Sequence, residues 1–321
     1  MKILIIKPGT LGDIIMSTPI IKRLQEHHAG EEIWLLTTPA YEILFSGWTG
    51  LNIKATTRAG VFNTFKTLNW IWQNKFDRLY DLQSNDRTTL LSALSGIPIR
   101  AGNHPRFPYH LHPETKYEGE CHSFERLNQI LESADIIEAA PNPFLPVTDL
   151  VVNKISSWLK TNKLTNSTIV LIHAGSSHLH KHKRWPYYAE LAKTLVHNNF
   201  DIIWIGSDDD ATLNKQLSKD SGIDATNQFT VPELVELGKQ ATFAITNDSA
   251  PMHLLSCSGI PVYGLFGPTD PGRTHALGQK HRIISASGDL PLNDSVFVPA
   301  DINIISCHSV MEFLNKEGLI T

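Results

Sequence analysis

Long apolar runs and cysteine are both scarce in this chain of 321 residues. No stretch reaches the roughly 18 consecutive apolar residues that a membrane-spanning helix needs. The first residues, MKILIIKPGTLGD, are interrupted by glycines and an aspartate before the apolar core of a signal peptide could develop. The three cysteines show no CxxC spacing, which fits a reducing compartment better than a disulfide framework. We therefore expect a cytoplasmic protein.

The chain also lacks a basic excess and an internal repeat. Its 28 lysines and arginines stand against 32 aspartates and glutamates, which gives a formal charge of −4. Proteins that bind nucleic acids generally carry a basic excess or a basic stripe, and neither is visible in the sequence. The absence of a repeat argues against a solenoid. The sequence therefore predicts a globular protein with no nucleic-acid partner.

Strand-sized apolar runs alternate along the chain with helix-sized amphipathic runs, a pattern typical of an α/β fold with parallel sheets. Its length exceeds the usual size of one hydrophobic core, so two domains are expected. The segment PNPFLPVTD, residues 141–149, has three prolines and little periodicity, which is typical of a linker. The clearest expected strands are KILIIK, EIWLLTT and DRLYDLQ before it, and STIVLIHAG, FDIIWIGS, TFAIT, IPVYGLFG and HRIIS after it.

The segment TNDSAPMHLLSCSGIPVYGLFGPTDP, residues 246–271, predicts a strand, a short helix and a second strand. Asn247, Asp248 and Ser249 are favourable helix caps, and Pro251 suits a first helical turn. A helix that starts at the carboxyl end of a parallel strand directs N–H groups and the positive end of its dipole toward the crevice there. This arrangement favours phosphate by up to about 2 kcal/mol. We expect a pyrophosphate site in this segment.

A second small loop, Pro8–Asp13, follows the first strand. Its two glycines permit a tight turn with exposed N–H groups. Thr18 and Pro19 read as the cap and first position of the following helix, which would leave Asp13 in the turn. Asp13 would then stand where open α/β sheets bind their ligands, although a helix-capping role is the simpler alternative.

These segments resemble glycosyltransferase family 9, the heptosyltransferases. The resemblance rests on KPGTLGDIIMSTP, YDLQSNDRTTLLSALSGIPIRAG, KRWP and NDSAPMHLLSCSGIPVYGLFGPTDP, in this order and spacing. It implies a GT-B fold, in which two Rossmann-like domains face each other across a cleft. The expected domains are residues 1–145 for the acceptor and 146–305 for the nucleotide sugar, with a helix in 306–321 packing back on the first domain. The implied reaction is inverting transfer of heptose from ADP-heptose to the lipopolysaccharide inner core.

The resemblance also assigns catalytic roles. Asp13 matches the family's LGD motif and would be the base that takes the proton of the acceptor hydroxyl. Lys183 in KRWP would stabilise the departing pyrophosphate. Lys181 lies two residues away, so the register between the two lysines stays open.

The remaining site residues fall into a donor set and an acceptor set. The expected donor-binding residues are Gly12, Ser176, Ser177, Asp210, Asp248, Ser249, Ala250 and His253. Asp210 would accept from ribose hydroxyls, with helix capping by the Asp208–Asp210 cluster as the alternative. The expected acceptor-binding residues are Arg58, Lys66 and Arg87, whose charges suit carboxylates and phosphates of a core oligosaccharide.

No cofactor is required by this interpretation, although Mg²⁺ could assist. His178, His180 and His182 alternate on a loop without the fixed geometry of a zinc site, so no metal ligands are assigned. The lipid-linked acceptor implies a peripheral contact with the cytosolic face of the inner membrane. Three alternatives stay open: another nucleotide-sugar donor or acceptor, a nucleotide-sugar epimerase of the same fold, and an inactive sugar-nucleotide-binding protein.

Overall fold

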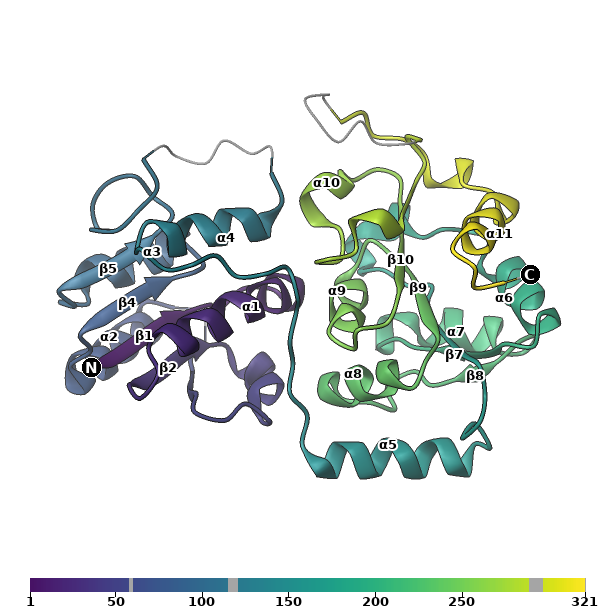
Figure 1. The fold of residues 1–321 in the computed structure, drawn as a ribbon, viewed down its shortest axis with the longest axis horizontal. Coiled ribbons are helices and arrows are strands. Elements are labelled where there is room, and N and C mark those ends of the chain that lie inside the picture. Colours follow the sequence, from purple (N-terminus) through teal and green to yellow (C-terminus); the bar gives the residue numbers. More distant parts are fainter. Residues whose placement is uncertain (58–59, 115–120, 289–296, 321) are drawn as a thin grey trace. The chain divides into compact units, whose positions relative to one another are not determined.

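The computed structural model describes residues 1–57, 60–114, 121–288 and 297–320. The chain divides into two compact units, Met1–Pro146 and Val147–Thr321. Each unit contains its own parallel β-sheet with helices packed against it (Figure 1). The expected α/β class with two Rossmann-like units is therefore confirmed.

The first unit has a five-stranded sheet in the order β3-β2-β1-β4-β5, and every neighbouring pair is parallel. Its strands are β1 (Lys2–Ile6), β2 (Glu32–Thr37), β3 (Asn52–Ala55), β4 (Arg78–Asp81) and β5 (Ile99–Gly102). Its helices are α1 (Leu11–His27), α2 (Val61–Asn74), α3 (Asp86–Leu94) and α4 (Ser123–Glu132), with a 3-10 segment η1 (Pro39–Phe45). The strand order reverses between β1 and β4, and such a reversal leaves a crevice at the carboxyl ends of the two strands.

The expected start of the first helix at Thr18 is wrong, because α1 begins at Leu11. Thr10 is its N-cap and has extended backbone dihedrals. The Asp13 carboxylate accepts hydrogen bonds from the Thr10 N–H and hydroxyl. This local bonding starts the helix eight residues before Pro19, and it places Asp13 in the first turn of the helix.

Pro19 consequently lies inside α1, where it has no N–H to donate to the carbonyl of Ile15. The Thr18 hydroxyl donates to that carbonyl instead, at 2.8 Å. The same hydroxyl oxygen accepts from the Phe144 N–H at 2.9 Å. A threonine next to the proline thus supplies the missing bond and lets the helix continue.

The second unit has a six-stranded parallel sheet in the order β11-β10-β9-β6-β7-β8. Its strands are β6 (Ile169–His173), β7 (Asp201–Trp204), β8 (Ile223–Asp224), β9 (Phe243–Asn247), β10 (Val262–Phe266) and β11 (Ile283–Ser285). Its α-helices are α5 (Asp149–Thr161), α6 (Tyr188–His197), α7 (Ala211–Leu217), α8 (Val231–Lys239), α9 (Ala250–Ser256), α10 (Pro271–Thr274) and α11 (Cys307–Lys316). Its 3-10 segments are η2 (His178–Lys183), η3 (Asp208–Asp210), η4 (Lys280–Arg282) and η5 (Ile302–Ile304).

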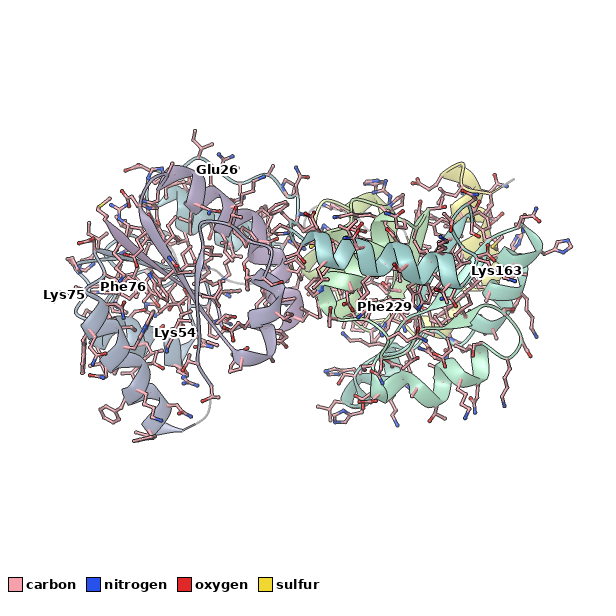
Figure 2. The ribbon with its side chains drawn as sticks, turned by 90° about the horizontal axis from the view of Figure 1, so that it is seen from below. Glu26, Lys54, Lys75, Phe76, Lys163 and Phe229 are labelled. Carbon is pink, nitrogen blue, oxygen red and sulfur yellow. The ribbon has the colours of Figure 1, made fainter. Side chains whose placement is uncertain are left out.

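The fully buried strand β6 separates two apolar cores. Val170 and Ile172 belong to one, while Ile169 and Leu171 belong to the other. This alternation follows from the two-residue period of a strand, and it explains why β6 is apolar at every position before His173. Figure 2 shows the side chains around the ribbon of each unit and labels Phe229 in the second unit. The Phe229 ring lies 5.0 Å from the Trp158 ring.

The C-terminal helix α11 is part of the core of the second unit. Val310 and Leu314 are completely buried, and the helix packs against α6. Just before α11, the carbonyl of Ile305 accepts from the Trp185 indole at 2.7 Å. The expected packing of residues 306–321 on the first domain stays a prediction.

The Asn247 side chain joins three segments of the second unit. Its amide nitrogen donates to the carbonyls of Ala174 and Gly175 at 3.0 and 2.8 Å. Its amide oxygen accepts from the Trp185 N–H at 3.0 Å and from the Tyr188 hydroxyl at 3.1 Å. Because Asn247 is fully buried, water cannot replace these partners.

We predict that Asn247→Ala lowers the free energy of unfolding by at least about 3 kcal/mol, because four buried polar groups lose a partner at once. Chemical denaturation measures this change. Asn198→Ala is the matched control, since the Asn198 side chain donates only to the Thr194 carbonyl at the end of α6. Its loss should stay below about 1 kcal/mol. Equal losses in the two variants would contradict a special role for Asn247.

Candidate active site

The candidate site residues gather at the carboxyl ends of the strands where each sheet reverses its order. In the first unit, Lys7 follows β1, and Leu82, Gln83 and Ser84 follow β4. The loop after β1 leads directly into α1 and Asp13. Open α/β sheets bind ligands at such reversal points, which makes this edge the candidate site of the first unit.

Asp13 is held by its neighbours in the turn. Its Oδ2 atom accepts from the Thr10 N–H at 3.2 Å and from the Thr10 hydroxyl at 2.8 Å. A Cβ atom at Gly9 would lie 2.9 Å from both the Asp13 Cβ and the Gln83 Oε1, so a larger residue at position 9 would displace the carboxylate. The half-buried Asp13 therefore caps α1 and also lines two pockets.

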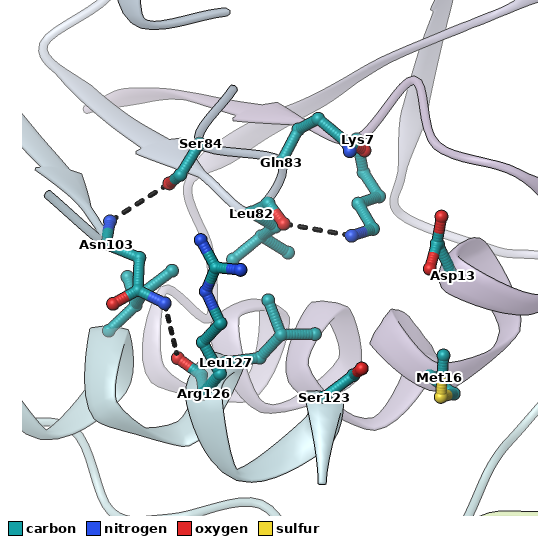
Figure 3. Close-up of a pocket in the computed structure, with 11 residues that line it drawn as sticks. Lys7, Asp13, Met16, Leu82, Gln83, Ser84, Asn103, Ser123, Arg126 and Leu127 are labelled. Atoms are coloured by element: carbon teal, nitrogen blue, oxygen red, sulfur yellow. Dashed lines mark hydrogen bonds between the residues drawn. The ribbon is translucent and has the colours of Figure 1, made fainter. Parts of the chain in front are cut away.

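The first of these, the Lys7 pocket, measures about 500 Å³ including its opening to solvent. It is lined by Lys7, Asp13, Met16, Leu82, Gln83, Ser84, Asn103, Ser123, Arg126, Leu127 and Ile130. Figure 3 shows the Lys7 ammonium, the Asp13 carboxylate and the Arg126 guanidinium facing this space. A carboxylate base beside two cationic groups gives the pocket the chemistry to hold a polar, negatively charged reactant.

Lys7 is buried, with 6% of its surface exposed, and its ammonium donates to the Leu82 carbonyl at 2.9 Å. Burial lowers the pKa of Lys7 from 10.5 to about 8, because the charged form loses solvent. The carboxylates of Asp13 and Asp81 oppose this shift, and the Arg126 guanidinium adds to it. The Asp13 carboxylate therefore favours the charged form of Lys7.

The second pocket, the Arg87 pocket, measures about 540 Å³ including its opening. It is lined by Ile6, Pro8, Gly9, Thr10, Asp13, Leu36, Thr56, Gln83, Asn85, Arg87, Thr88 and Leu91. Arg87 donates to the Thr57 carbonyl at 3.0 Å, which ties the start of α3 to the loop after β3. Asp13 thus has a cationic pocket and a more apolar pocket beside it.

A buried carboxyl supports the loop after β4. Asp81 has no exposed surface and accepts from the Tyr109 hydroxyl at 2.6 Å and from the Ser84 and Gln83 N–H groups at 2.8 and 3.0 Å. Burial raises the pKa of Asp81 despite these bonds. Gln83 and Ser84, which line the Lys7 pocket, are therefore positioned by a side chain that does not itself reach the pocket lining.

In the second unit the strand order reverses between β6 and β9. Ala174 and Gly175 follow β6, and Asp248 and Ser249 follow β9. Lys183 comes to the same edge, because its ammonium lies 2.6 Å from Asp248 Oδ2. The sheet thus brings together residues that are more than sixty positions apart in the chain.

Lys183 and Asp248 form a largely buried ion pair, with 17% and 9% of their side chains exposed. The Thr269 hydroxyl donates to the same Asp248 oxygen at 2.7 Å. Lys181, the alternative in the sequence, is exposed. The geometry therefore favours Lys183 as the lysine of the site, and it fixes its charge at the carboxyl edge of the sheet.

A chain of polar contacts runs from Ser249 to Asp210 through His173. Ser249 Oγ lies 3.2 Å from His173 Nδ1, and His173 Nε2 lies 3.4 Å from Asp210 Oδ2. Burial opposes ionisation of Asp210, but His173, the Ser207 N–H and Arg184 outweigh it and lower the Asp210 pKa. Asp210 is 3% exposed and caps η3 in a capping box with Ser207. Its expected contact with ribose stays a prediction, and the Asp210 side chain makes no capping bond to α7, the helix that the capping alternative concerned.

The other expected donor residues differ in exposure, and all but Gly12 belong to the second unit. The Ser176 hydroxyl is buried and donates to the His180 carbonyl at 3.0 Å, while Ser177 is exposed and caps η2. Ala250 is the half-buried first residue of α9, and His253 is 6% exposed within that helix. Gly12 is buried in the first turn of α1. Donor binding by these residues stays a prediction.

Of the expected acceptor residues, Arg87 lines a pocket with Asp13, whereas Lys66 does not line either pocket of Asp13. The Lys66 ammonium lies 4.6 Å above the Phe62 ring on α2. Arg58 lies outside the described residues. Of the two that the structure describes, Arg87 lines a pocket of Asp13 and Lys66 does not.

Two further expectations concern metals and membranes. In the described part of the chain, no group of three or more His, Cys, Asp and Glu side chains could hold a metal ion. The described residues also contain no helix with both the length and the apolar character needed to cross a bilayer.

Sequence reasoning missed several residues of these sites. Lys7 was read as the end of a strand, although a lysine directly after an apolar strand at a sheet's carboxyl edge was a usable signal. His173 carries the same signal, because it ends the apolar strand β6, whereas Arg126 carries none, because its position depends on α4.

The chain is similar to several known proteins. The sequence profile of glycosyltransferase family 9 (heptosyltransferase) matches residues 65–293. Lipopolysaccharide heptosyltransferase 2 of Escherichia coli strain K12 is 24% identical over 305 residues, which cover 88% of each chain. The structure of a family 9 glycosyl transferase from Veillonella parvula has a TM-score of 0.84 at 19% identity, covering 98% of this chain and 96% of that one. The E. coli ADP-heptose LPS heptosyltransferase II structure has a TM-score of 0.77 at 21% identity, covering 98% of both. The likeness to these structures confirms the GT-B fold class.

We predict that Lys7 titrates near pH 8 in the folded protein, below the ordinary lysine pKa of 10.5, because burial disfavours its charged form. NMR of ¹³C-labelled lysine side chains, assigned with Lys7→Met, measures this pKa. Asp13→Asn should lower the Lys7 pKa further, because it removes a carboxylate that favours the ammonium form.

The lowered pKa of Lys7 makes the stability of the protein depend on pH. Between about pH 8 and 10.5 the folded protein binds fewer protons at Lys7 than the unfolded chain does, so Lys7 makes the free energy of unfolding rise with pH in this window. A Lys7 pKa near 10.5, or one that rises in Asp13→Asn, would contradict the placement of Lys7 in a buried pocket beside Asp13.

Proposed function

Because the chain belongs to glycosyltransferase family 9, the heptosyltransferase family, we propose that it transfers heptose from ADP-heptose to the inner core of lipopolysaccharide with inversion at the anomeric carbon. The family match confirms the resemblance drawn from the motifs, and the protein is a glycosyltransferase. ADP-heptose, the inner-core acceptor and inversion are our proposals. The donor and acceptor are suggested by the names of its relatives.

The observation that carries this proposal is the placement of Asp13. Its carboxylate is fixed by Thr10 at the reversal point of the first sheet and lines two pockets. In the proposed reaction Asp13 accepts the proton of the acceptor hydroxyl while that oxygen forms a bond to the anomeric carbon. The bond from this carbon to the diphosphate oxygen breaks on the opposite side, so configuration inverts.

Lys183 supports the departure of ADP in this proposal. As the bond to the sugar breaks, negative charge grows on the diphosphate, and an ammonium group at the carboxyl edge of the second sheet can stabilise it. The Lys183–Asp248 pair supports this role, because Asp248 and Thr269 hold the lysine at that edge. Ser249, Ala250 and the other donor residues would bind the remainder of the nucleotide sugar.

The acceptor side of the proposal uses the first unit. Lys7 and Arg126 in one pocket, and Arg87 in the other, suit the negative groups of a core oligosaccharide. We propose that the protein meets this lipid-linked acceptor at the cytosolic face of the inner membrane. Assistance by Mg²⁺ stays a prediction, which an assay with and without chelator would decide.

We predict that Asp13→Asn lowers kcat by about 10²- to 10⁴-fold while binding of ADP-heptose is retained, because the variant keeps the side-chain shape but loses the base. The assay measures radiolabelled heptose transferred to heptose-deficient lipopolysaccharide. Glu233→Gln is the matched control, since Glu233 accepts from the Thr230 N–H in the capping box of α8 but lines neither pocket of Asp13. Full activity of Asp13→Asn would remove Asp13 as the base.

The same assay separates the alternatives. A folded wild type that binds ADP-heptose but transfers nothing points to another acceptor or to an inactive binding protein. Conversion of a UDP-sugar without any acceptor would identify an epimerase. A wild type that binds no sugar nucleotide would refute the proposed reaction.

The two neighbouring lysines offer a second prediction. Lys183→Met should lower kcat by about a hundredfold, because it removes charge stabilisation of the leaving diphosphate. Lys181→Met, the matched control, should leave kcat nearly unchanged, since Lys181 is exposed. Steady-state kinetics of both variants decides which lysine acts in the reaction. A larger loss of kcat in Lys181→Met than in Lys183→Met would show that the register of the KRWP motif was misassigned.

A further inference from the structure

Helix α2 presents large apolar side chains to solvent. Val61, Phe62, Phe65 and Trp72 are exposed over 74%, 70%, 62% and 50% of their surface. No other helix in the described ranges exposes as many large apolar residues. We call these four residues the α2 apolar face. Burial of such side chains in a partner would remove an unfavourable contact with water.

The exposed residues form one stripe of the helix and not a random scatter. At 100° per residue, positions 61, 62, 65 and 72 fall within about 100° of one another. The adjoining side carries Thr67, Leu68 and Ile71, which are buried, and Ile71 belongs to the apolar core of the first unit. The core therefore uses one side of α2 and leaves a second apolar side without a place in the fold.

Neighbouring groups extend this surface. The Trp72 indole N–H donates to the Leu94 carbonyl at 3.0 Å, and the Leu94 side chain at the end of α3 is half exposed. The Trp72 N–H is thus satisfied while half of its surface faces solvent. The apolar surface consequently continues from α2 to the end of α3.

The charge of the helix points to an anionic partner. From Val61 to Lys75 the chain has two lysines and no acidic residue. Lys66 is exposed beside the stripe, with its ammonium above the Phe62 ring, and Lys75 is exposed at the end of α2 (Figure 2). Helices that lie in a membrane interface combine Phe, Trp and Leu with lysines in this way.

The position of α2 connects this surface to the candidate site. The helix follows β3 by a short loop, and Thr56 of that loop lines the Arg87 pocket together with Asp13. Arg87 donates to the carbonyl of Thr57 in the same loop. Val61 and Phe62 of the α2 apolar face are therefore five and six positions from Thr56, which lines the Arg87 pocket together with Asp13.

We propose that the α2 apolar face inserts into the interface of an anionic phospholipid membrane, so that a lipid-linked acceptor reaches the Arg87 pocket without leaving the bilayer surface. The role in acceptor delivery rests on the proposed function. The insertion itself rests on the exposed stripe, its lysines and the absence of acidic side chains from Val61 to Lys75.

The test uses the full chain and vesicles of phosphatidylglycerol mixed with phosphatidylcholine. We expect the wild type to sediment with these vesicles and to bind pure phosphatidylcholine vesicles more weakly. The double variant Phe62→Ser, Phe65→Ser should lose at least about tenfold in vesicle affinity. Both side chains are exposed, so the variant should keep its unfolding midpoint.

The matched control is the double variant Ile137→Ser, Leu150→Ser, whose side chains are 78% and 79% exposed but lie outside α2. It should bind vesicles like the wild type. Equal binding of the Phe62, Phe65 variant and the wild type would overturn the proposal. A lipid-free dimer that this variant dissociates would also overturn it, because the face would then contact a second copy.

Transfer assays separate this inference from the proposed reaction. With an acceptor embedded in vesicles, the Phe62, Phe65 variant should transfer heptose at least about tenfold more slowly than the wild type. With a deacylated, water-soluble acceptor the two should be equal. If the wild type transfers heptose to neither acceptor, the proposed reaction fails, while the vesicle-binding result still decides membrane insertion.

Discussion

The carboxamide of Asn247 is the interaction on which the second half of the molecule depends. Sheets place strand ends side by side, but the loops that follow have no ladder to hold them. Asn247 supplies both donors and acceptors to the loop after β6 and to the start of α6. Lys183 precedes one of these bonded residues by two positions, and Asp248 follows Asn247 directly. The distance between the ion-pair partners is thus a consequence of one buried amide.

The central strands, and α9 and α11 among the second unit's helices, follow from the sequence, because their apolar residues recur at the period of the element that buries them. The strands β3, β5 and β8 do not, and all three lie at sheet edges. An edge strand has a neighbour on one side only, so its sequence can stay short and polar, as in NIKA and IRAG. These residues are strands because their backbones bond to the neighbouring strands β2 and β4. The apolar pattern of the sequence does not predict such bonds.

The candidate site also contains residues that the sequence predicts and residues that it does not. Asp13 and Asp248 are candidates from the sequence because each lies in a short motif after a predicted strand, and Lys183 is one because it lies in KRWP. Their partners were not found, because Thr269, His173 and Arg126 reach the site through the tertiary fold. The early start of α1 shows the same limit at short range. Pro19 was read as a helix start, yet the Thr18 hydroxyl satisfies the carbonyl that the proline leaves open.

The two bonds from Thr10 to Asp13 have a stereochemical consequence. Both end on Oδ2, which divides the carboxylate into an anchored oxygen and an outward one, Oδ1. Rotation of the group by a quarter turn would break both bonds, whereas a half turn only exchanges two equivalent oxygens. A proton arriving at Asp13 is therefore received by one defined oxygen and from one direction. A glutamate in its place would carry the same charge and lose this aim, since the added methylene moves both oxygens away from Thr10.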